Sequence, residues 1–322
     1  MRVGIVGCGL IGKKRAAAIG ADSLVAVCDR DPLRARVLAA EHPGAIAVSL
    51  DQLIEATDAV IVSTTNDQLA PIASRAIEAG RHVLLEKPGA RSLDELESVA
   101  RRAATRGVIV RVGYNHRFHP AARRAREIIL AGDCGPLMFV RARYGHGGRQ
   151  GYDREWRADP TLSGGGELID QGVHLIDLSR WYLDSEFADA FGRLVTAYWD
   201  MKVEDNAFLT LTTTAGQIAH LHASCTEWKN LFSFEIYGRQ GKLHLEGLGG
   251  SYGVERLHCY RMRREMGPPD TVIYEYPFAD TSWQLEWKDF VAAIDGAPDT
   301  AATLQDALAT MRVVTQIYER CR

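Results

Sequence analysis

Short apolar runs alternate with segments of helical periodicity over the first 118 residues of the chain. The runs lie at 3–6, 24–28, 45–48, 59–63, 82–86 and 108–112. Strands that are apolar along nearly their whole length are buried on both faces, as in a parallel sheet covered by helices. We therefore predict an α/β fold that begins with a doubly covered parallel sheet over residues 1–119.

The pattern changes after Phe118-His119-Pro120. The elements that follow are a helix at 121–131, a strand at 137–144, a helix at 167–182 and seven strand-like segments between 188 and 276. Turn signals separate these last segments, which is typical of an antiparallel sheet. We predict that residues 120–322 form a second, α+β domain for substrate binding and oligomerisation, with a final helix at 304–318 that packs back on the first domain.

Composition and charge restrict the class of protein. The chain has 322 residues, 46% of them hydrophobic and 25% charged, which is enough to bury two cores. The net charge of -3 gives no overall attraction for nucleic acid. The six cysteines form no CxxC pair, the start lacks the apolar region of a signal peptide, and no apolar run approaches a membrane span. We expect a cytoplasmic protein without nucleic-acid, membrane or metal partners.

A glycine-rich turn, Gly7-Cys8-Gly9-Leu10-Ile11-Gly12, follows the first predicted strand and opens a helix. In that context the G-x-G-x-x-G pattern binds the pyrophosphate of a dinucleotide at a helix N-terminus. Asp29 ends the second strand, where an acid accepts the adenosine ribose hydroxyls and repels a 2′-phosphate. NAD is therefore the predicted cofactor. Arg30 leaves NADP open because arginine can bind that phosphate, and Asp29 could instead be a simple turn residue after an edge strand.

Polar side chains follow two further strands of the predicted sheet. Thr64 and Asn66 come after the strand at 59–63, and Glu86-Lys87-Pro88 ends the strand at 82–86. Because ligands bind outside the carboxyl ends of parallel strands, we predict that Thr64, Asn66, Glu86 and Lys87 line the cofactor crevice. Lys87 can hold a substrate oxygen and stabilise developing negative charge. Its alternative roles are structural: it can cap a helix or pair with Glu86.

Three glycines at 164–166 precede the helical pattern at 167–182. Asp170 and His174 are four residues apart, so they lie on one helix face, and Asp177 continues the row. A carboxylate beside an imidazole shifts the imidazole pKa and favours a general base that works near neutral pH. The alternatives are a metal site built from these three side chains and a solvated charged face. We favour the general base.

The chain resembles the Gfo/Idh/MocA family of glucose-fructose oxidoreductases and inositol dehydrogenases over essentially its whole length. The resemblance rests on the glycine turn at 7–12, on Glu86-Lys87-Pro88, on Gly113-Tyr114-Asn115-His116-Arg117-Phe118, and on the segment from Gly165 to Asp177 that contains His174. It implies a Rossmann domain, then a domain with a large, mostly antiparallel open sheet, and a homodimer or homotetramer. The sequence departs from the family pattern at Thr65 and Leu69, where the family often has proline and histidine.

The resemblance also implies roles for individual residues. Lys87 hydrogen-bonds the reacting hydroxyl, His174 acts as general acid or base, Asp170 supports His174, and Asn115 lies near the nicotinamide. The implied reaction is NAD(P)-dependent oxidation of a secondary alcohol, or its reverse. The alternative is a glycosidase or lyase that oxidises its sugar only transiently. A non-catalytic regulator is disfavoured because Lys87 and His174 are both present.

The loop at 145–157 mixes aromatic faces, hydrogen-bonding side chains and three arginines. The first two suit a polyol, and arginine suits a carboxylate or phosphate. We therefore predict a sugar, a cyclitol or a nucleotide-linked sugar as substrate. The alternative for the arginines is pairing with Asp153, Glu155 and Asp159. The predicted substrate-binding residues are Lys87, Arg117, Tyr144, Arg149, Trp156, Asp170 and His174.

Overall fold

A computed structural model describes residues 1–20, 23–298 and 300–321. These residues form two compact units. The first unit contains Met1–Asn115, Thr161–Gly164 and Trp283–Leu308, and the second contains His116–Pro160, Gly165–Ser282 and the chain from Ala309 on. The first break lies close to the boundary expected at 119. The sequence pattern does not foresee that Thr161–Gly164 and the chain from Trp283 to the start of the final helix belong to the first unit, and the packing of the final helix on this unit stays a prediction. No helix in the described part of the chain has the length and apolar character needed to cross a membrane.

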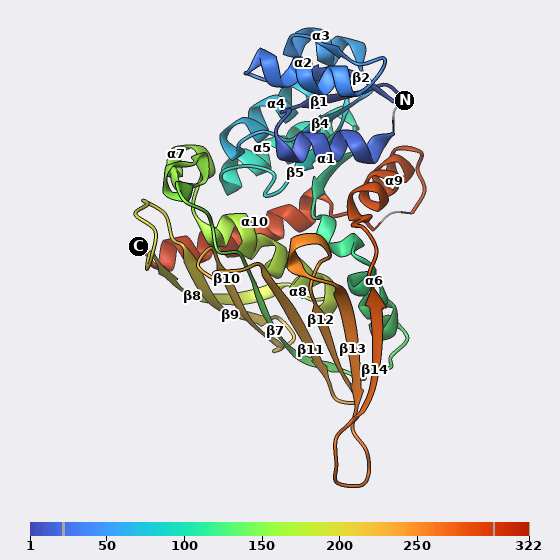
Figure 1. Cartoon of the computed structure of the whole chain (residues 1–322), viewed down its shortest axis with the longest axis vertical. Helices are drawn as coiled ribbons and strands as arrows, with labels where there is room; N and C mark the ends of the chain where they lie inside the picture. Colours follow the sequence, from blue (N-terminus) through green and yellow to red (C-terminus); the bar gives the residue numbers. More distant parts are fainter. Residues whose placement is uncertain (21–22, 299, 322) are drawn as a thin grey trace. The chain divides into compact units, whose positions relative to one another are not determined.

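The first unit contains a six-stranded sheet in the order β3-β2-β1-β4-β5-β6, and each of its pairings is parallel (Figure 1). Its strands are β1 (Val3–Val6), β2 (Leu24–Cys28), β3 (Ile46–Ala47), β4 (Ala59–Val62), β5 (His82–Glu86) and β6 (Val110–Gly113). The predicted parallel α/β sheet is confirmed. The strand order reverses between β1 and β4, and ligands of such sheets bind at that switch point, outside the carboxyl ends of the strands.

Helices from both ends of the chain accompany this sheet. They are α1 (Leu10–Ile19), α2 (Pro32–Glu41), α3 (Leu50–Ala56), α4 (Asn66–Glu78), α5 (Leu93–Arg106) and α9 (Ser282–Ile294, from its second residue), together with the start of α10 (Leu304–Cys321). Local sequence explains their starts: Ser49 and Gln52 form a capping box at α3, and the Asp31 and Ser92 side chains cap α2 and α5. Phe290 of α9 belongs to the same core as the strand residues of β1 and β4.

The second unit contains an eight-stranded sheet in the order β14-β13-β12-β11-β7-β10-β9-β8. Its strands are β7 (Leu137–Gly145), β8 (Phe187–Val195), β9 (Asn206–Thr213), β10 (Ile218–Ser224), β11 (Leu231–Gly238), β12 (Lys242–Glu246), β13 (Glu255–Arg261) and β14 (Asp270–Tyr276). Among these described strands only β7 and β10 pair in parallel, so the predicted mostly antiparallel sheet is confirmed. The helices α6 (Pro120–Leu130) and α8 (Val173–Leu183) cover one face (Figure 1).

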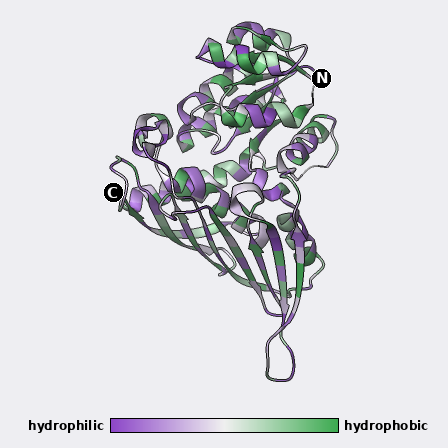
Figure 2. Ribbon diagram, viewed as in Figure 1, coloured by the Kyte–Doolittle hydropathy of each residue, from purple (hydrophilic) through white to green (hydrophobic). Residues whose placement is uncertain are grey.

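Polar and apolar residues alternate along the strands of this sheet (Figure 2). In β7, Val140 and Tyr144 are buried, whereas Arg141 is exposed. The alternation is looser near 207–225, which alone would fit a sheet covered on both faces, but Phe208 and Ile218 are exposed there. The sheet therefore has one packed face and one open face, as antiparallel sheets commonly do.

The helix expected over 167–182 consists of two segments of different geometry. Leu168–Gly172 form a π-helical turn, and α8 begins at Val173. Apolar spacing predicts the helical segment but does not distinguish these two geometries, because five residues are too few to show a change of period. Turns of this kind occur frequently at functional sites.

Candidate active site

The glycine turn after β1 has the geometry that a dinucleotide requires. Gly7 has a φ of +95°, and a side chain there would overlap the Ser63 carbonyl oxygen. A side chain at Gly12 would overlap the Gly7 carbonyl oxygen, so α1 packs directly on the turn. At Gly9 a side chain would meet no atom within 4 Å. The fold itself thus requires glycine at 7 and 12. Gly9 has a different role: it leaves open space in front of the N-terminus of α1, and a bound pyrophosphate would occupy that space.

Asp29 lies beside this turn. Its carboxylate accepts hydrogen bonds from the backbone N–H groups of Cys8 (2.7 Å) and Asp31 (2.8 Å). Burial, reinforced by the charge of Asp29, raises the pKa of the Cys8 thiol to about 12, so the thiol stays protonated. The structure therefore brings together the turn and the acid. Leu10, 73% exposed, leaves an apolar side chain in the open at the start of α1, and Arg30 is exposed as well.

Residues after β4 and β6 show structural contacts besides their predicted roles. Asn66 is the first residue of α4, and its amide donates to the Ser163 carbonyl oxygen (2.8 Å). The Thr64 hydroxyl donates to the Thr65 carbonyl oxygen (3.2 Å). Asn115 is buried at the start of a 3-10 turn. Cofactor contacts by Thr64, Asn66 and Asn115 stay predictions.

Lys87 lies in a turn directly after β5. The backbone N–H of Gly89 donates to the Glu86 carbonyl oxygen (2.9 Å) and closes this turn. The Glu86 side chain accepts a hydrogen bond from Arg15 Nε of α1 (2.6 Å), and Arg15 Nη1 donates to Glu286 of α9 (2.5 Å). The ion pair of Glu86 is thus with a helix residue, and its cofactor contact stays a prediction. Sequence reasoning missed Arg15 and Glu286, because no local pattern marks a charge as buried and paired.

The glycines before the π-helical turn are required by packing. A side chain at Gly165 would overlap the Tyr318 hydroxyl of α10, and one at Gly166 would overlap the Glu204 carbonyl oxygen. The Glu204 carboxylate accepts hydrogen bonds from the N–H groups of Gly166 and Leu168 (both 3.1 Å) and from the Tyr318 hydroxyl (2.7 Å). Burial raises the pKa of Glu204 despite these bonds. This buried side chain, which sequence reasoning missed, anchors the start of the π-helical turn.

His174, the second residue of α8, is 4% exposed. Its ring packs against that of His116, with centroids 3.8 Å apart, and lies edge-on to Tyr144 at 5.9 Å. Asp170 lies in the preceding π-helical turn, and its carboxylate accepts a hydrogen bond from Arg157 Nε (3.1 Å). The ion pair of Asp170 is therefore with a loop arginine. Its support of His174 stays a prediction.

Three tyrosines lie near the carboxylates of Glu167 and Asp170. Burial raises the pKa of Tyr144, whose hydroxyl also hydrogen-bonds Tyr252. Burial likewise raises the pKa of Tyr252, and the charges of Asp170 and Glu167 raise both values further. The Tyr152 hydroxyl donates to Glu167 (3.1 Å). These hydroxyls stay protonated, so they can exchange hydrogen bonds with the hydroxyls of a polyol.

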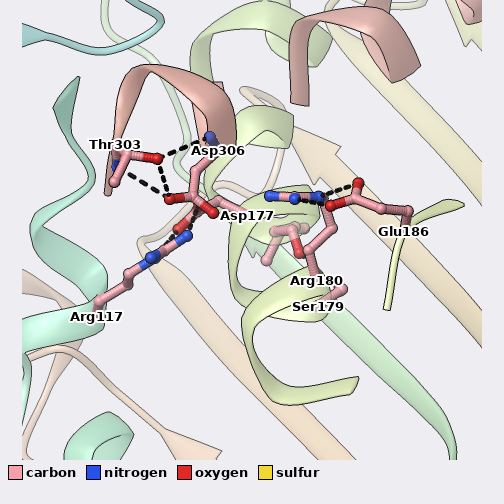
Figure 3. Close-up of polar contacts among 8 residues, drawn as sticks. Arg117, Asp177, Ser179, Arg180, Glu186, Thr303 and Asp306 are labelled. Carbon is pink, nitrogen blue, oxygen red and sulfur yellow. Dashed lines mark hydrogen bonds and ion pairs between the residues drawn. The ribbon is translucent and has the colours of Figure 1, made fainter. Parts of the chain in front are cut away.

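Arg117 is held in a buried ion pair. Its Nε and Nη2 donate to the two carboxylate oxygens of Asp177 (2.8 and 2.6 Å; Figure 3). Asp177, expected to continue the row of Asp170 and His174, therefore anchors an arginine, and the substrate contact of Arg117 stays a prediction. Among the described residues, no three His, Cys, Asp or Glu side chains are arranged to hold a metal ion.

The loop arginines contact neighbouring acids. Arg149 pairs with Glu155 (2.6 Å) and is 71% exposed. The Arg157 guanidinium lies over the Trp156 ring, 4.6 Å from its centroid, while it bonds Asp170. Of the three acids expected as partners, Glu155 pairs with Arg149, whereas Arg157 donates its hydrogen bond to Asp170. Substrate contacts by Arg149 and Trp156 stay predictions.

Comparisons with known proteins cover both parts of the chain. The family model "Oxidoreductase family, NAD-binding Rossmann fold" matches residues 1–114, and the model "GFO/IDH/MocA C-terminal domain" matches residues 122–244. The 1,5-anhydro-D-fructose reductase of Ensifer adhaerens is 33% identical over 208 residues, which span 62% of this chain and 61% of the reductase. Inositol 2-dehydrogenase 2 of Saccharopolyspora erythraea is 29% identical over 97% of this chain and 91% of that enzyme.

A solved structure of levoglucosan dehydrogenase in complex with NADH has the same fold. Its TM-score is 0.88 at 20% identity, and the match covers 100% of this chain and 96% of the other. The two family models, one on each side of residue 119, agree with the parallel sheet and the antiparallel sheet described above. The chain belongs to the GFO/IDH/MocA family of oxidoreductases and contains its NAD-binding Rossmann fold.

Proposed function

We propose that this protein is an NAD-dependent dehydrogenase that interconverts a secondary alcohol and a ketone on a neutral sugar or cyclitol. One observation carries the proposal: the same chain holds a dinucleotide cradle, at Gly9 and Asp29, and a buried imidazole, His174, packed near protonated tyrosines. The similarity to an inositol dehydrogenase and to an anhydrofructose reductase supports the substrate class.

Each proposed role follows from the chemistry of the side chain. When bound, NAD supplies the acceptor for the hydride that leaves the alcohol carbon. His174 takes the hydroxyl proton, and such a positioned proton transfer contributes on the order of 10²–10⁴-fold in rate. Lys87 donates a hydrogen bond to the same oxygen and stabilises the negative charge that develops there. Asp170, whose carboxylate is paired with Arg157, supports His174 from the turn that precedes it.

The arginines of the substrate loop support a neutral substrate. Arg149 is paired with Glu155, and Arg157 with Asp170, so the charge of each is already balanced. An anionic group would have to draw an arginine away from its carboxylate. The ion pair gained with the substrate would then only replace the ion pair lost within the protein. Sugar hydroxyls need no such exchange. We therefore infer that free sugars and cyclitols are better substrates than phosphorylated or nucleotide-linked sugars.

A substrate screen that follows NADH absorbance tests the proposal. Free sugars, inositols and amino sugars are compared with their phosphorylated and nucleotide-linked counterparts. We expect net NADH formation with a free sugar or cyclitol, and loss of turnover in Lys87→Ala and in His174→Asn while NAD binding persists. His42→Asn, at the C-terminal end of α2, is the matched control and should behave as wild type. A fully active Lys87→Ala enzyme refutes the role of Lys87, and sugar turnover without net NADH supports transient oxidation instead.

Cofactor preference is tested at Asp29. The carboxylate should repel the 2′-phosphate of NADP, so Asp29→Asn should shift the ratio of Kd values towards NADP. We expect a shift of about tenfold or more, since tenfold corresponds to only about 1.4 kcal/mol. An unchanged ratio would contradict the assigned position of the ribose.

We also propose that the open face of the second sheet mediates self-association. Phe139, Phe191, Phe208 and Ile218 are exposed on four adjacent strands, and the register places all four on the same face. Large apolar side chains that are exposed together on one face commonly mark an interface, and a second copy offers the same surface in return. Light scattering should show a dimer or tetramer, and Phe208→Asp should shift it towards monomer. A monomeric wild-type protein would refute this proposal.

A further inference from the structure

A buried cluster of charges connects the lysine turn of the first unit to two of its helices. Glu86, the last residue of β5, is bonded to Arg15 of α1, which is bonded in turn to Glu286 of α9. All three side chains are buried, Arg15 and Glu286 completely. The Trp283 ring lies 4.5 Å from the Arg15 guanidinium. The proposed chemistry uses none of these four side chains, although burying ionised groups carries a large desolvation penalty.

The ion pair immobilises the residue that precedes Lys87. The Glu86 side chain is held by Arg15 (2.6 Å), and its carbonyl oxygen accepts a hydrogen bond from Gly89 (2.9 Å). On the neighbouring strand, a side chain at Gly113 would come within 2.6 Å of Arg15 Nη2, so the sheet closes directly over the pair. The turn that carries Lys87 is therefore fixed at both ends.

We propose that Arg15 is a positioning residue for the dehydrogenase reaction: it holds the Glu86 carboxylate and thereby aims the Lys87 ammonium group, and Glu286 keeps Arg15 in place. The inference rests on the proposed function, in which Lys87 stabilises charge on the substrate oxygen. Lysine has a long, flexible stem with no fixed fork of donors, so the direction of its head group depends on a well-placed backbone. A displacement of about 1 Å at a reacting centre can cost on the order of 10²-fold in rate.

The alternative is that the cluster only fastens α1 to the sheet. Because α1 carries the glycine turn, a fastening role predicts weaker NAD binding and lower stability when Arg15 is changed, with kcat nearly intact. A positioning role predicts the opposite division: kcat falls, while the Kd for NAD and the KM for substrate stay nearly constant.

Variants at position 15 separate the two roles. Arg15→Met removes the charge, and Arg15→Lys keeps a charge that can reach Glu86 without the fork that also binds Glu286. We expect kcat to fall on the order of 10–100-fold in Arg15→Met and to recover in part in Arg15→Lys. Lys14→Met is the matched control, because Lys14 also lies over Trp283, at 5.2 Å, but is exposed. It should retain wild-type kcat.

A second measurement needs neither substrate nor cofactor. Competitive acetylation of the free protein with acetic anhydride, read by peptide mass spectrometry, compares the reactivity of Lys87 with that of the exposed Lys229. The ratio should change in Arg15→Met and return towards wild type in Arg15→Lys. This readout also shows whether Arg15→Met retains its fold, because unfolding would increase the labelling of all lysines. If Arg15→Met is unfolded, the comparison with wild type is made with Arg15→Lys alone.

The outcomes distinguish this inference from the proposed function. Wild-type kcat and wild-type Lys87 labelling in Arg15→Met overturn the positioning role, as does a raised Kd for NAD with unchanged kcat. If Lys87→Ala is fully active, the proposed function itself fails. An inactive Lys87→Ala beside a fully active Arg15→Met refutes only the positioning role.

Discussion

Replacing Glu286 by glutamine should change how the stability of the protein depends on pH. Burial raises the pKa of the Glu286 carboxyl to about 7; the attraction of Arg15 opposes this effect, and the charge of Glu86 adds to it. The ordinary value, expected in the unfolded chain, is 4.5. Between these two pH values the folded protein binds the proton more tightly than the unfolded chain does. The free energy of unfolding therefore falls as the pH rises through this window.

The magnitude follows from the two pKa values. Because each pH unit in the window removes about 1.36 kcal/mol, the loss amounts to about 3 kcal/mol, and it ends above pH 7, where both states are ionised. Solvent screening does not reduce this figure, since Glu286 is completely buried. The Glu286→Gln variant cannot ionise at this position, and its amide oxygen can still accept a hydrogen bond from Arg15. The variant should therefore lack this part of the pH dependence.

Urea unfolding, followed by tryptophan fluorescence from about pH 4.5 to 8 at constant ionic strength, measures the effect. The stability of Glu286→Gln relative to wild type should increase by about 3 kcal/mol across the window. Glu41→Gln is the control, because the Glu41–Lys13 pair (3.1 Å) is exposed and should contribute little at any pH. A flat difference would refute the reasoning. Such a flat difference would mean that the charge of Arg15 keeps the pKa of Glu286 below the window, so that the carboxylate is ionised throughout it.

Three further predictions test the remaining assignments. Gly9→Ala should unfold at the wild-type temperature but bind NAD poorly, whereas Gly12→Ala should lose about 1–3 kcal/mol of stability through overlap with the turn; equal stabilities would contradict the packing argument. Arg117→Met removes both hydrogen bonds from Arg117 to the buried carboxylate of Asp177 and should lower the free energy of unfolding by about 3–5 kcal/mol in urea titrations, so a negligible loss would count against the ion pair. Arg149→Ala removes an exposed pair and should leave the KM for a neutral sugar unchanged, while a large increase would restore Arg149 as a substrate ligand.

The fold could be predicted from the sequence wherever burial produces a regular spacing of apolar residues. Strands covered on both faces have to be apolar throughout, and helices on a sheet need one apolar face, so the order of elements in the first unit is evident from residues 1–118. The cradle was predictable for a related reason. Gly7, Gly12 and Asp29 lie within one strand–turn–helix–strand unit, and their mutual geometry is set by local chain connectivity.

Partners of buried charges could not be predicted in this way. Arg15 and Glu286 are 271 residues apart, and each looks like a solvated residue on its helix. The same holds for Arg117, which belongs to a recognisable motif but is paired with Asp177, 60 residues further along the chain. The periodicity of a sequence shows which face of a helix or strand is buried. It does not show which distant side chain that face contacts. For this reason the sequence predicts a substrate contact for Arg117. It does not decide whether the loop arginines bind the substrate or pair with neighbouring acids.

The glycines at 165 and 166 show how a local motif can record a distant constraint. In the sequence they look like the flexible end of a loop, yet both are tightly enclosed, one by the Tyr318 hydroxyl and the other by the backbone of Glu204. The Glu204 carboxylate in turn binds the first N–H groups of the π-helical turn that carries Asp170. A larger residue at either position would push this turn away from its anchor. We therefore infer that these glycines serve to place Asp170 rigidly, and that flexibility is not their purpose.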